Sequence, residues 1–112
     1  EITLCDETKI VEVKDGKILE YTIAPEMFGF KRAFHADIQG GTPEENAEIL
    51  LRTLKGEEQS PKSDIVILNA MFALYTADFV KHPADAKPLI QEAIRSGKVY
   101  EHYLKMINTN KE

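Results

Sequence analysis

The chain has 112 residues, enough for one domain with a modest hydrophobic core. Its 14 basic and 19 acidic side chains give a net charge of −5, which disfavours nucleic-acid binding because that function relies on surplus lysine and arginine. Cys5 is the only cysteine, so an intrachain disulfide and a cysteine-based zinc cluster are excluded, and a reducing cytoplasm fits.

A β-hairpin is predicted over about residues 8–23. Residues 9–13 and 17–23 are rich in β-branched and aromatic side chains, which favour strands. Between these runs, Asp15 and Gly16 supply the positive φ angles that a type I′ turn requires. Two strands alone are marginal in water, so the hairpin needs a helix or further strands to lie on, and such strands have to come from elsewhere.

Residues 25–39 show no clean period and are predicted to form an ordered, irregular connector. Phe28, Phe30 and Phe34 fall within this short stretch. Leaving three phenylalanines in water is costly, which argues against disorder.

A helix is predicted over about residues 43–55. Thr42 can serve as its N-cap, Pro43 suits the first helical position, and Glu45 completes the spacing of a capping box. Gly56 ends it. The residues spaced three and four apart on its apolar face are Ala47, Leu50, Leu51 and Leu54.

A second helix is predicted over about residues 64–79, with Ser63 as its cap. Apolar residues occur on all its sides, which indicates burial within a bundle. The apolar stretch 65–77 is well short of the ~20 residues that a membrane span needs. Asn69 is the polar exception, and an unpaired buried amide costs about 1–3 kcal/mol. A hydrogen bond to a neighbouring loop or helix end is the preferred interpretation, with ligand contact as the alternative.

Two further helices are predicted over about residues 86–96 and 99–107. Asp85 can cap the first, which places Pro88 in its first turn, and fraying is expected beyond Asn108. No internal repeat or long linker divides the chain, so one unit is expected. Helical spacing predicts a core made of Leu50, Leu51, Leu54, Ile67, Leu68, Met71, Leu74, Ile90, Ile94 and Leu104.

The sequence assigns no catalytic and no cofactor-binding residue within the chain. His35, His82 and His102 are too far apart to form a local ligand pattern and are expected at the surface. Neither a nucleophile motif nor a P-loop is found. Nucleophilic catalysis therefore has no candidate here.

The turn at residues 40–42 precedes a helix and could in principle hold a phosphate at the helix amino terminus. However, Pro43 removes one N–H donor, and Glu44 and Glu45 bring negative charge to the same place. A capped structural turn is the preferred interpretation.

Three segments together resemble the carboxyl-terminal portion of anthranilate phosphoribosyltransferases: residues 24–30 (Ala-Pro-Glu-Met-Phe-Gly-Phe), the turn at 40–47, and residues 64–70 (Asp-Ile-Val-Ile-Leu-Asn-Ala). The resemblance runs from Glu1 to about Ile107. It implies an α/β fold in which a hairpin and four helices form the last segment of the larger α/β domain. It also implies a complete enzyme, a homodimer, that transfers the phosphoribosyl group of phosphoribosyl pyrophosphate to anthranilate in tryptophan biosynthesis.

The resemblance further implies that Glu1 is a magnesium ligand. Glu1 matches the second carboxylate of an Asp-Glu pair that binds Mg²⁺ in that family, whereas a mobile chain end is the simpler interpretation. The chain has no initiator methionine and lacks the family's Gly-Thr-Gly-Gly-Asp and Lys-His-Gly-Asn-Arg motifs, which lie in the preceding, N-terminal part of the family's proteins. We therefore expect a piece of an enzyme that is inactive by itself.

Two alternatives remain open at this point. One is a non-catalytic or nucleic-acid-binding relative on the same scaffold, against which the net charge of −5 argues. The other is a nucleoside phosphorylase of the same broader superfamily, although residues 24–30 and 64–70 look more like the anthranilate enzyme. The glycine-rich and basic motifs of the preceding sequence would separate these classes.

Overall fold

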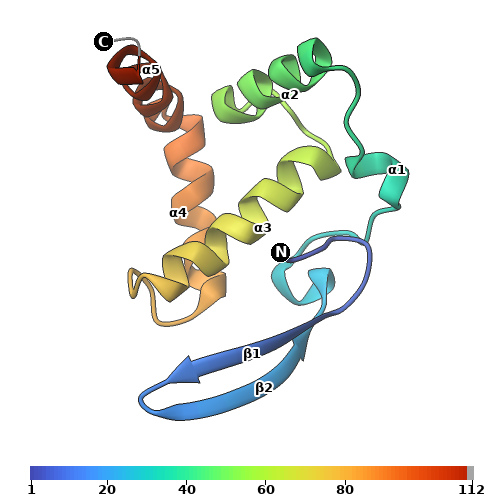
Figure 1. Cartoon of the computed structure of the whole chain (residues 1–112), viewed down its shortest axis with the longest axis vertical. Helices are drawn as coiled ribbons and strands as arrows, with labels where there is room; N and C mark the ends of the chain where they lie inside the picture. Colours follow the sequence, from blue (N-terminus) through green and yellow to red (C-terminus); the bar gives the residue numbers. More distant parts are fainter. Residues whose placement is uncertain (111–112) are drawn as a thin grey trace.

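The computed structural model describes residues 1–110, in which a hairpin is followed by helices (Figure 1). This order confirms the predicted fold class, and a 3₁₀ helix and a short extra helix are added within the connector. No helix within these residues has both the length and the apolar character needed to cross a membrane. The elements are β1 (Thr8–Lys14), β2 (Lys17–Ile23), η1 (Pro25–Phe28), α1 (His35–Ile38), α2 (Pro43–Lys55), α3 (Pro61–Thr76), α4 (Pro83–Arg95) and α5 (Lys98–Asn110).

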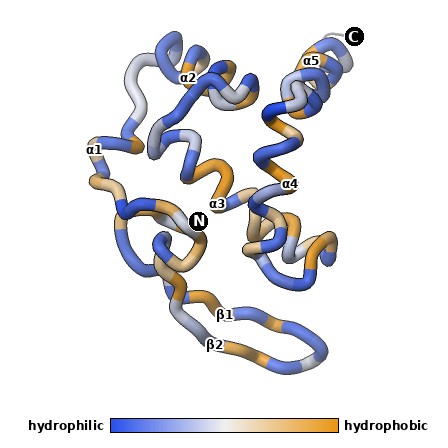
Figure 2. The backbone as a smooth tube through the Cα atoms, turned by 180° about the vertical axis from the view of Figure 1, so that it is seen from behind, coloured by the Kyte–Doolittle hydropathy of each residue, from blue (hydrophilic) through white to orange (hydrophobic). Residues whose placement is uncertain are grey.

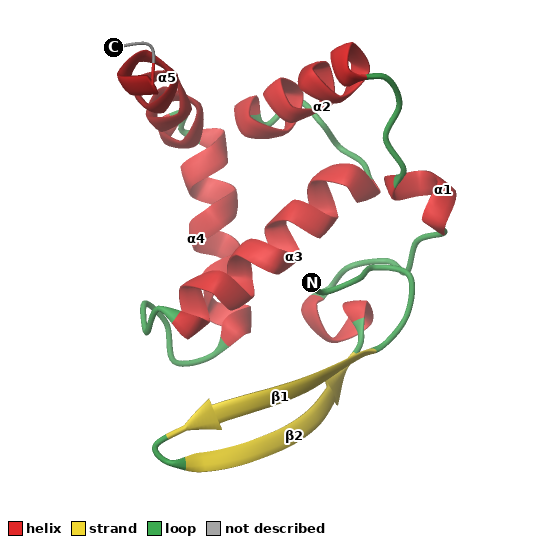
Figure 3. Ribbon diagram, in the orientation of Figure 1, coloured by secondary structure: helices red, strands yellow, loops and turns green. Residues whose placement is uncertain are grey.

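The hairpin projects from the helical part of the molecule (Figure 3). Strands β1 and β2 pair antiparallel, in a register that runs from Thr8 opposite Ile23 to Lys14 opposite Lys17. The turn between them is the predicted one, because both Asp15 (φ 52°) and Gly16 (φ 74°) have positive φ.

A shared carboxylate ties the hairpin to helix α3. Glu12 on β1 accepts hydrogen bonds from the hydroxyls of Tyr75 on α3 (2.7 Å) and Tyr21 on β2 (2.8 Å). These two bonds, led by that from Tyr75, lower the pKa of Glu12. Burial, followed by the bond to Glu12, raises the pKa of Tyr21 to about 12. Within the described residues the hairpin thus rests on a helix, and no further strand joins it.

The connector is ordered, as predicted. Phe28 and Phe30 pack against the helices, whereas Phe34 does not. Phe28 meets Phe72 edge to face with ring centroids 5.5 Å apart. Phe30 is buried, and the Lys87 ammonium lies 4.0 Å from its ring centroid while donating to the Phe28 carbonyl at 2.6 Å. Phe34, in contrast, is 81% exposed.

Helix α3 begins at Pro61 rather than at residue 64, because Ser60 and not Ser63 is its N-cap. The Ser60 hydroxyl accepts from the Lys62 N–H at 3.2 Å, and proline occupies the first helical position. Ser63 is buried in the first turn, where its hydroxyl donates to the Ser60 carbonyl. The helix ends before the predicted residue 79, since Asp78 adopts a left-handed conformation with φ 62°.

Helix α4 also begins early, with His82 at the N-cap position and Pro83 in the first turn. The predicted cap, Asp85, therefore lies inside that turn, where its charge still complements the helix dipole. Pro88 lies in the helix interior, so its predicted place in the first turn was wrong. Helix α5 continues through Asn110, past the predicted end at 107.

The core gathers around α3 and the amino-terminal segment. Figure 2 shows hydrophobic residues concentrated along α3 and alternating with hydrophilic ones in the hairpin. The buried apolar residues are Ile2, Leu4, Ile23, Phe30, Ala33, Leu68, Met71 and Ala86, with Pro25 also fully enclosed.

The predicted core was fully correct for the middle of α3, and the predicted Ile67, Leu74 and Ile90 pack against that core. Leu68 (1% exposed) and Met71 (0%) are central. Leu50 (47%) and Leu104 (42%) are exposed, so their assignment to the core was wrong: helical spacing identifies an apolar face but not what covers it. The remaining predicted residues are partly buried: Leu51, Leu54, Ile67, Leu74, Ile90 and Ile94.

We predict that Leu68→Ala lowers the free energy of unfolding by about 2–5 kcal/mol, because it removes buried atoms and leaves a cavity. Leu104→Ala is the matched control and should change it by only about 0.5 kcal/mol, as is usual for surface positions. Urea denaturation of both variants measures the difference. Equal losses would contradict the assignment of the core.

We also predict an acid-sensitive link between the hairpin and α3. Because hydrogen bonding lowers the folded-state pKa of Glu12, its contribution to stability is complete above the unfolded pKa and is lost as the pH falls through the folded one. Tyr75→Phe removes the main cause, so this variant should lose less stability than the parent between about pH 5 and pH 3. Melting temperatures across this range test the prediction, with Tyr103→Phe as a control that should behave as the parent.

Candidate functional site

The candidate site is the amino-terminal segment, which lies beside the middle of α3 (Figure 1). The side-chain amide of Asn69 on α3 forms two hydrogen bonds with the backbone of Ile2. Its Oδ1 accepts from the Ile2 N–H at 2.9 Å, and its Nδ2 donates to the Ile2 carbonyl, also at 2.9 Å. A third bond runs from Nδ2 to the Ile65 carbonyl at 2.9 Å. The hydrogen-bonding interpretation of Asn69 is confirmed, and its partner is this chain segment.

Two side chains anchor the same segment in the core. Ile2 is 9% exposed and Leu4 is fully buried. The Leu4 carbonyl also accepts from the Ala33 N–H at 2.9 Å. The backbone that follows Glu1 is therefore held by burial and hydrogen bonds. The interpretation of Glu1 itself as a mobile chain end stays a prediction.

Glu1 itself is exposed. None of the ion pairs between the described residues involves its carboxylate. Residues 1–110 contain no group of three or more histidine, cysteine, aspartate or glutamate side chains that could hold a metal ion. Mg²⁺ usually keeps several waters and takes only one or two carboxylates, so the lone carboxylate of Glu1 could supply one ligand but not a complete site.

The turn before α2 uses its polar groups internally. The Asn46 side chain accepts from the Gly41 N–H at 2.8 Å and donates to the Gly41 carbonyl at 3.3 Å. Thr42 caps the helix by accepting from the Glu45 N–H at 3.2 Å. This arrangement is the predicted capped turn, and the Asn46 contact is an addition that the sequence did not reveal.

The three histidines are exposed and occupy separate parts of the fold. His35 opens α1, His82 precedes α4, and His102 lies on α5. Their surface positions confirm the prediction.

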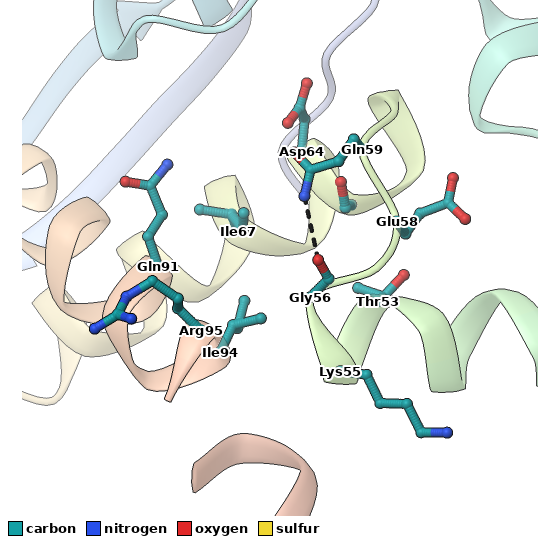
Figure 4. Close-up of a pocket in the computed structure, with 11 residues that line it drawn as sticks. Thr53, Lys55, Gly56, Glu58, Gln59, Asp64, Ile67, Gln91, Ile94 and Arg95 are labelled. Atoms are coloured by element: carbon teal, nitrogen blue, oxygen red, sulfur yellow. Dashed lines mark hydrogen bonds between the residues drawn. The ribbon is translucent and has the colours of Figure 1, made fainter. Parts of the chain in front are cut away.

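A cleft of about 380 Å³ lies where the end of α2, the first half of α3 and the second half of α4 meet (Figure 4). One of its two acidic residues, Glu58, accepts hydrogen bonds from Arg52 (3.0 Å) and from the Ser60 hydroxyl (2.6 Å). Burial raises the pKa of Asp64, which also lines the cleft. Gln59 spans the rim by donating to the Gly56 carbonyl at 3.3 Å. Glu58 and Gln59 are thus used in contacts within the fold, whereas the Asp64 carboxylate has no hydrogen-bond or ion-pair partner among the described residues. No nucleophile with a base is found among the lining residues.

Sequence comparison gives consistent relatives for nearly the whole chain. Residues 1–100 match a family described as the glycosyl transferase family, a/b domain. An anthranilate phosphoribosyltransferase from Clostridium beijerinckii is 48% identical over 103 residues, and one from Methanosarcina barkeri is 50% identical over 99. These alignments cover 92% and 88% of this chain but 30% and 27% of the relatives.

Structure comparison agrees. The crystal structure of anthranilate phosphoribosyltransferase from Thermus thermophilus superposes with a TM-score of 0.81 at 37% identity. The match covers 96% of this chain and 32% of that one. The chain thus spans about 30% of the length of the relatives it matches.

Proposed function

This chain belongs to the glycosyl transferase family through its a/b domain, and we propose that it forms the carboxyl-terminal segment of an anthranilate phosphoribosyltransferase. The observation that carries the proposal is the agreement in both sequence and structure over nearly the whole chain with enzymes of that name. The complete enzyme would transfer the phosphoribosyl group of phosphoribosyl pyrophosphate to the nitrogen of anthranilate, in tryptophan biosynthesis.

The chemistry would be divided between this chain and the preceding part of the enzyme. Displacing pyrophosphate requires stabilisation of charge on the leaving group and orientation of the attacking amine. In the turn at residues 40–42 the Gly41 N–H is bonded to Asn46, and in the cleft Glu58 is bonded to Arg52. The sequence also contains neither a P-loop nor the family's basic segment. The phosphate-binding and basic segments would therefore come from the N-terminal part.

Glu1 would be this chain's contribution to the metal site, as one oxygen ligand of Mg²⁺. Its carboxylate is a hard ligand exposed at the end of a fixed segment, and it pairs with no described cation. When bound, Mg²⁺ would neutralise charge on the pyrophosphate. A second carboxylate would precede Glu1 in the complete enzyme.

Two further features belong to the same proposal. A cytoplasmic location is supported by the lone free cysteine, Cys5, which suits a reducing compartment. A homodimer would assemble through the helical domain that the family's proteins carry in their N-terminal part.

We predict that the complete enzyme turns over anthranilate and phosphoribosyl pyrophosphate with Mg²⁺, whereas the 112-residue chain alone does not. The physical reason is that the sequence contains neither a P-loop nor the family's basic substrate segment to hold the pyrophosphate. A steady-state assay of both proteins measures this. Turnover by the isolated chain would contradict the division of labour, and turnover of a nucleoside with phosphate, instead of anthranilate, would assign the phosphorylase reaction.

We predict that Glu1→Gln in the complete enzyme weakens the Mg²⁺ dependence of kcat/KM and leaves the melting temperature nearly unchanged. The substitution keeps the shape and removes the charge that binds the cation. Glu20→Gln, at an exposed position on β2, is the matched control and should alter neither quantity. An unchanged Mg²⁺ dependence would remove Glu1 from the metal site, and a large loss of stability would give its carboxylate a role in the fold.

A further inference from the structure

We infer that Asn69 is a positioning residue: by holding the backbone of Ile2, it sets where the Glu1 carboxylate stands. The inference rests on the proposed role of Glu1 as a Mg²⁺ ligand. Asn69 lies 67 residues from Ile2 in the sequence and itself touches neither substrate nor metal in this account.

The contact is specific to an amide side chain. The Ile2 N–H needs an acceptor and the Ile2 carbonyl needs a donor, and Asn69 supplies both at 2.9 Å. The bond from Nδ2 to the Ile65 carbonyl fixes the amide in this orientation. An aspartate could satisfy the Ile2 N–H but neither carbonyl, and an apolar side chain could satisfy none of the three.

The segment has other anchors further along, so Asn69 is not needed merely to keep it attached. Leu4 is fully buried and bonded to Ala33, and Thr3 donates its N–H to the Thr8 hydroxyl at 3.4 Å. In the described structure, however, Asn69 provides the only hydrogen bonds to the backbone of Ile2. Loss of Asn69 would thus leave Leu4 in the core while releasing the backbone next to Glu1.

Such a release matters because a metal ligand must be held at a defined place. Partners that orient metal ligands typically change metal affinity by about 10- to 100-fold when they are removed. Misplacement by about 1 Å is enough to slow a positioned reaction markedly. Asn69 would act on the metal only through Glu1, and that dependence can be measured.

The experiment compares variants of the complete enzyme in Mn²⁺ binding, followed by electron paramagnetic resonance in the presence of pyrophosphate. Asn69→Leu should weaken Mn²⁺ binding about 10-fold or more and speed hydrogen exchange at Ile2. Ser63→Ala is the matched control, since it removes a different buried hydrogen bond of the same helix, to Ser60, and should leave Mn²⁺ binding unchanged. If Asn69→Leu does not fold, Asn69→Asp carries the same comparison.

The double variant Glu1→Gln/Asn69→Leu separates a positioning role from a purely structural one. If Asn69 acts through Glu1, the double variant should bind Mn²⁺ about as weakly as Glu1→Gln alone. Additive effects, or normal Mn²⁺ binding by Asn69→Leu, would overturn the inference. If Glu1→Gln alone binds Mn²⁺ normally, the metal role of Glu1 fails and this inference fails with it, whereas continued turnover of anthranilate would leave the enzyme assignment intact.

Discussion

The docking of the amino-terminal segment on α3 is the interaction on which the rest of the structure depends. Ile2 and Leu4 enter the same core as Leu68 and Met71, so the segment completes the apolar cluster that α3 would otherwise leave open. A buried backbone in such a place needs hydrogen-bond partners, and Asn69 provides them for Ile2. One polar residue in an apolar helix thereby makes burial of an irregular segment possible.

The hairpin is held on α3 by polar side-chain contacts, unlike the amino-terminal segment, which is held mainly by burial. Two strands cannot bury a core by themselves, and the inner face of this hairpin is joined to α3 through Glu12 and the hydroxyl of Tyr75. The outer face, which includes Val13 (74% exposed) and Ile18 (71%), stays uncovered in the described structure. Polar contacts of this kind are directional, so they fix how the hairpin lies on the helix as well as holding it there.

Under the proposed function, the chain would supply position more than chemistry. Polar groups of its cleft and of its glycine turn, such as Glu58 and Asn46, form contacts within the fold and so help to stabilise it. The carboxylate of Glu1 differs, because it is exposed and adjoins a segment whose path the core determines. If Glu1 is the Mg²⁺ ligand proposed above, this scaffold would hold the ligand in place while phosphate binding falls to another part of the enzyme.

The sequence by itself determined the features that depend on neighbours a few residues apart. The turn at Asp15 and Gly16 and the Thr42 cap follow from local geometry, and the order of hairpin and helices follows from local periodicity. The cap of α3 was also a local feature, because Ser60 precedes Pro61 as Thr42 precedes Pro43, although Ser63 was predicted instead. Only the tertiary structure decided that Leu50 and Leu104 stay exposed, since a helix face is buried only where another element covers it. The sequence also could not identify Ile2 as the hydrogen-bond partner of Asn69, because the two residues lie 67 positions apart and local spacing carries no information on such a contact.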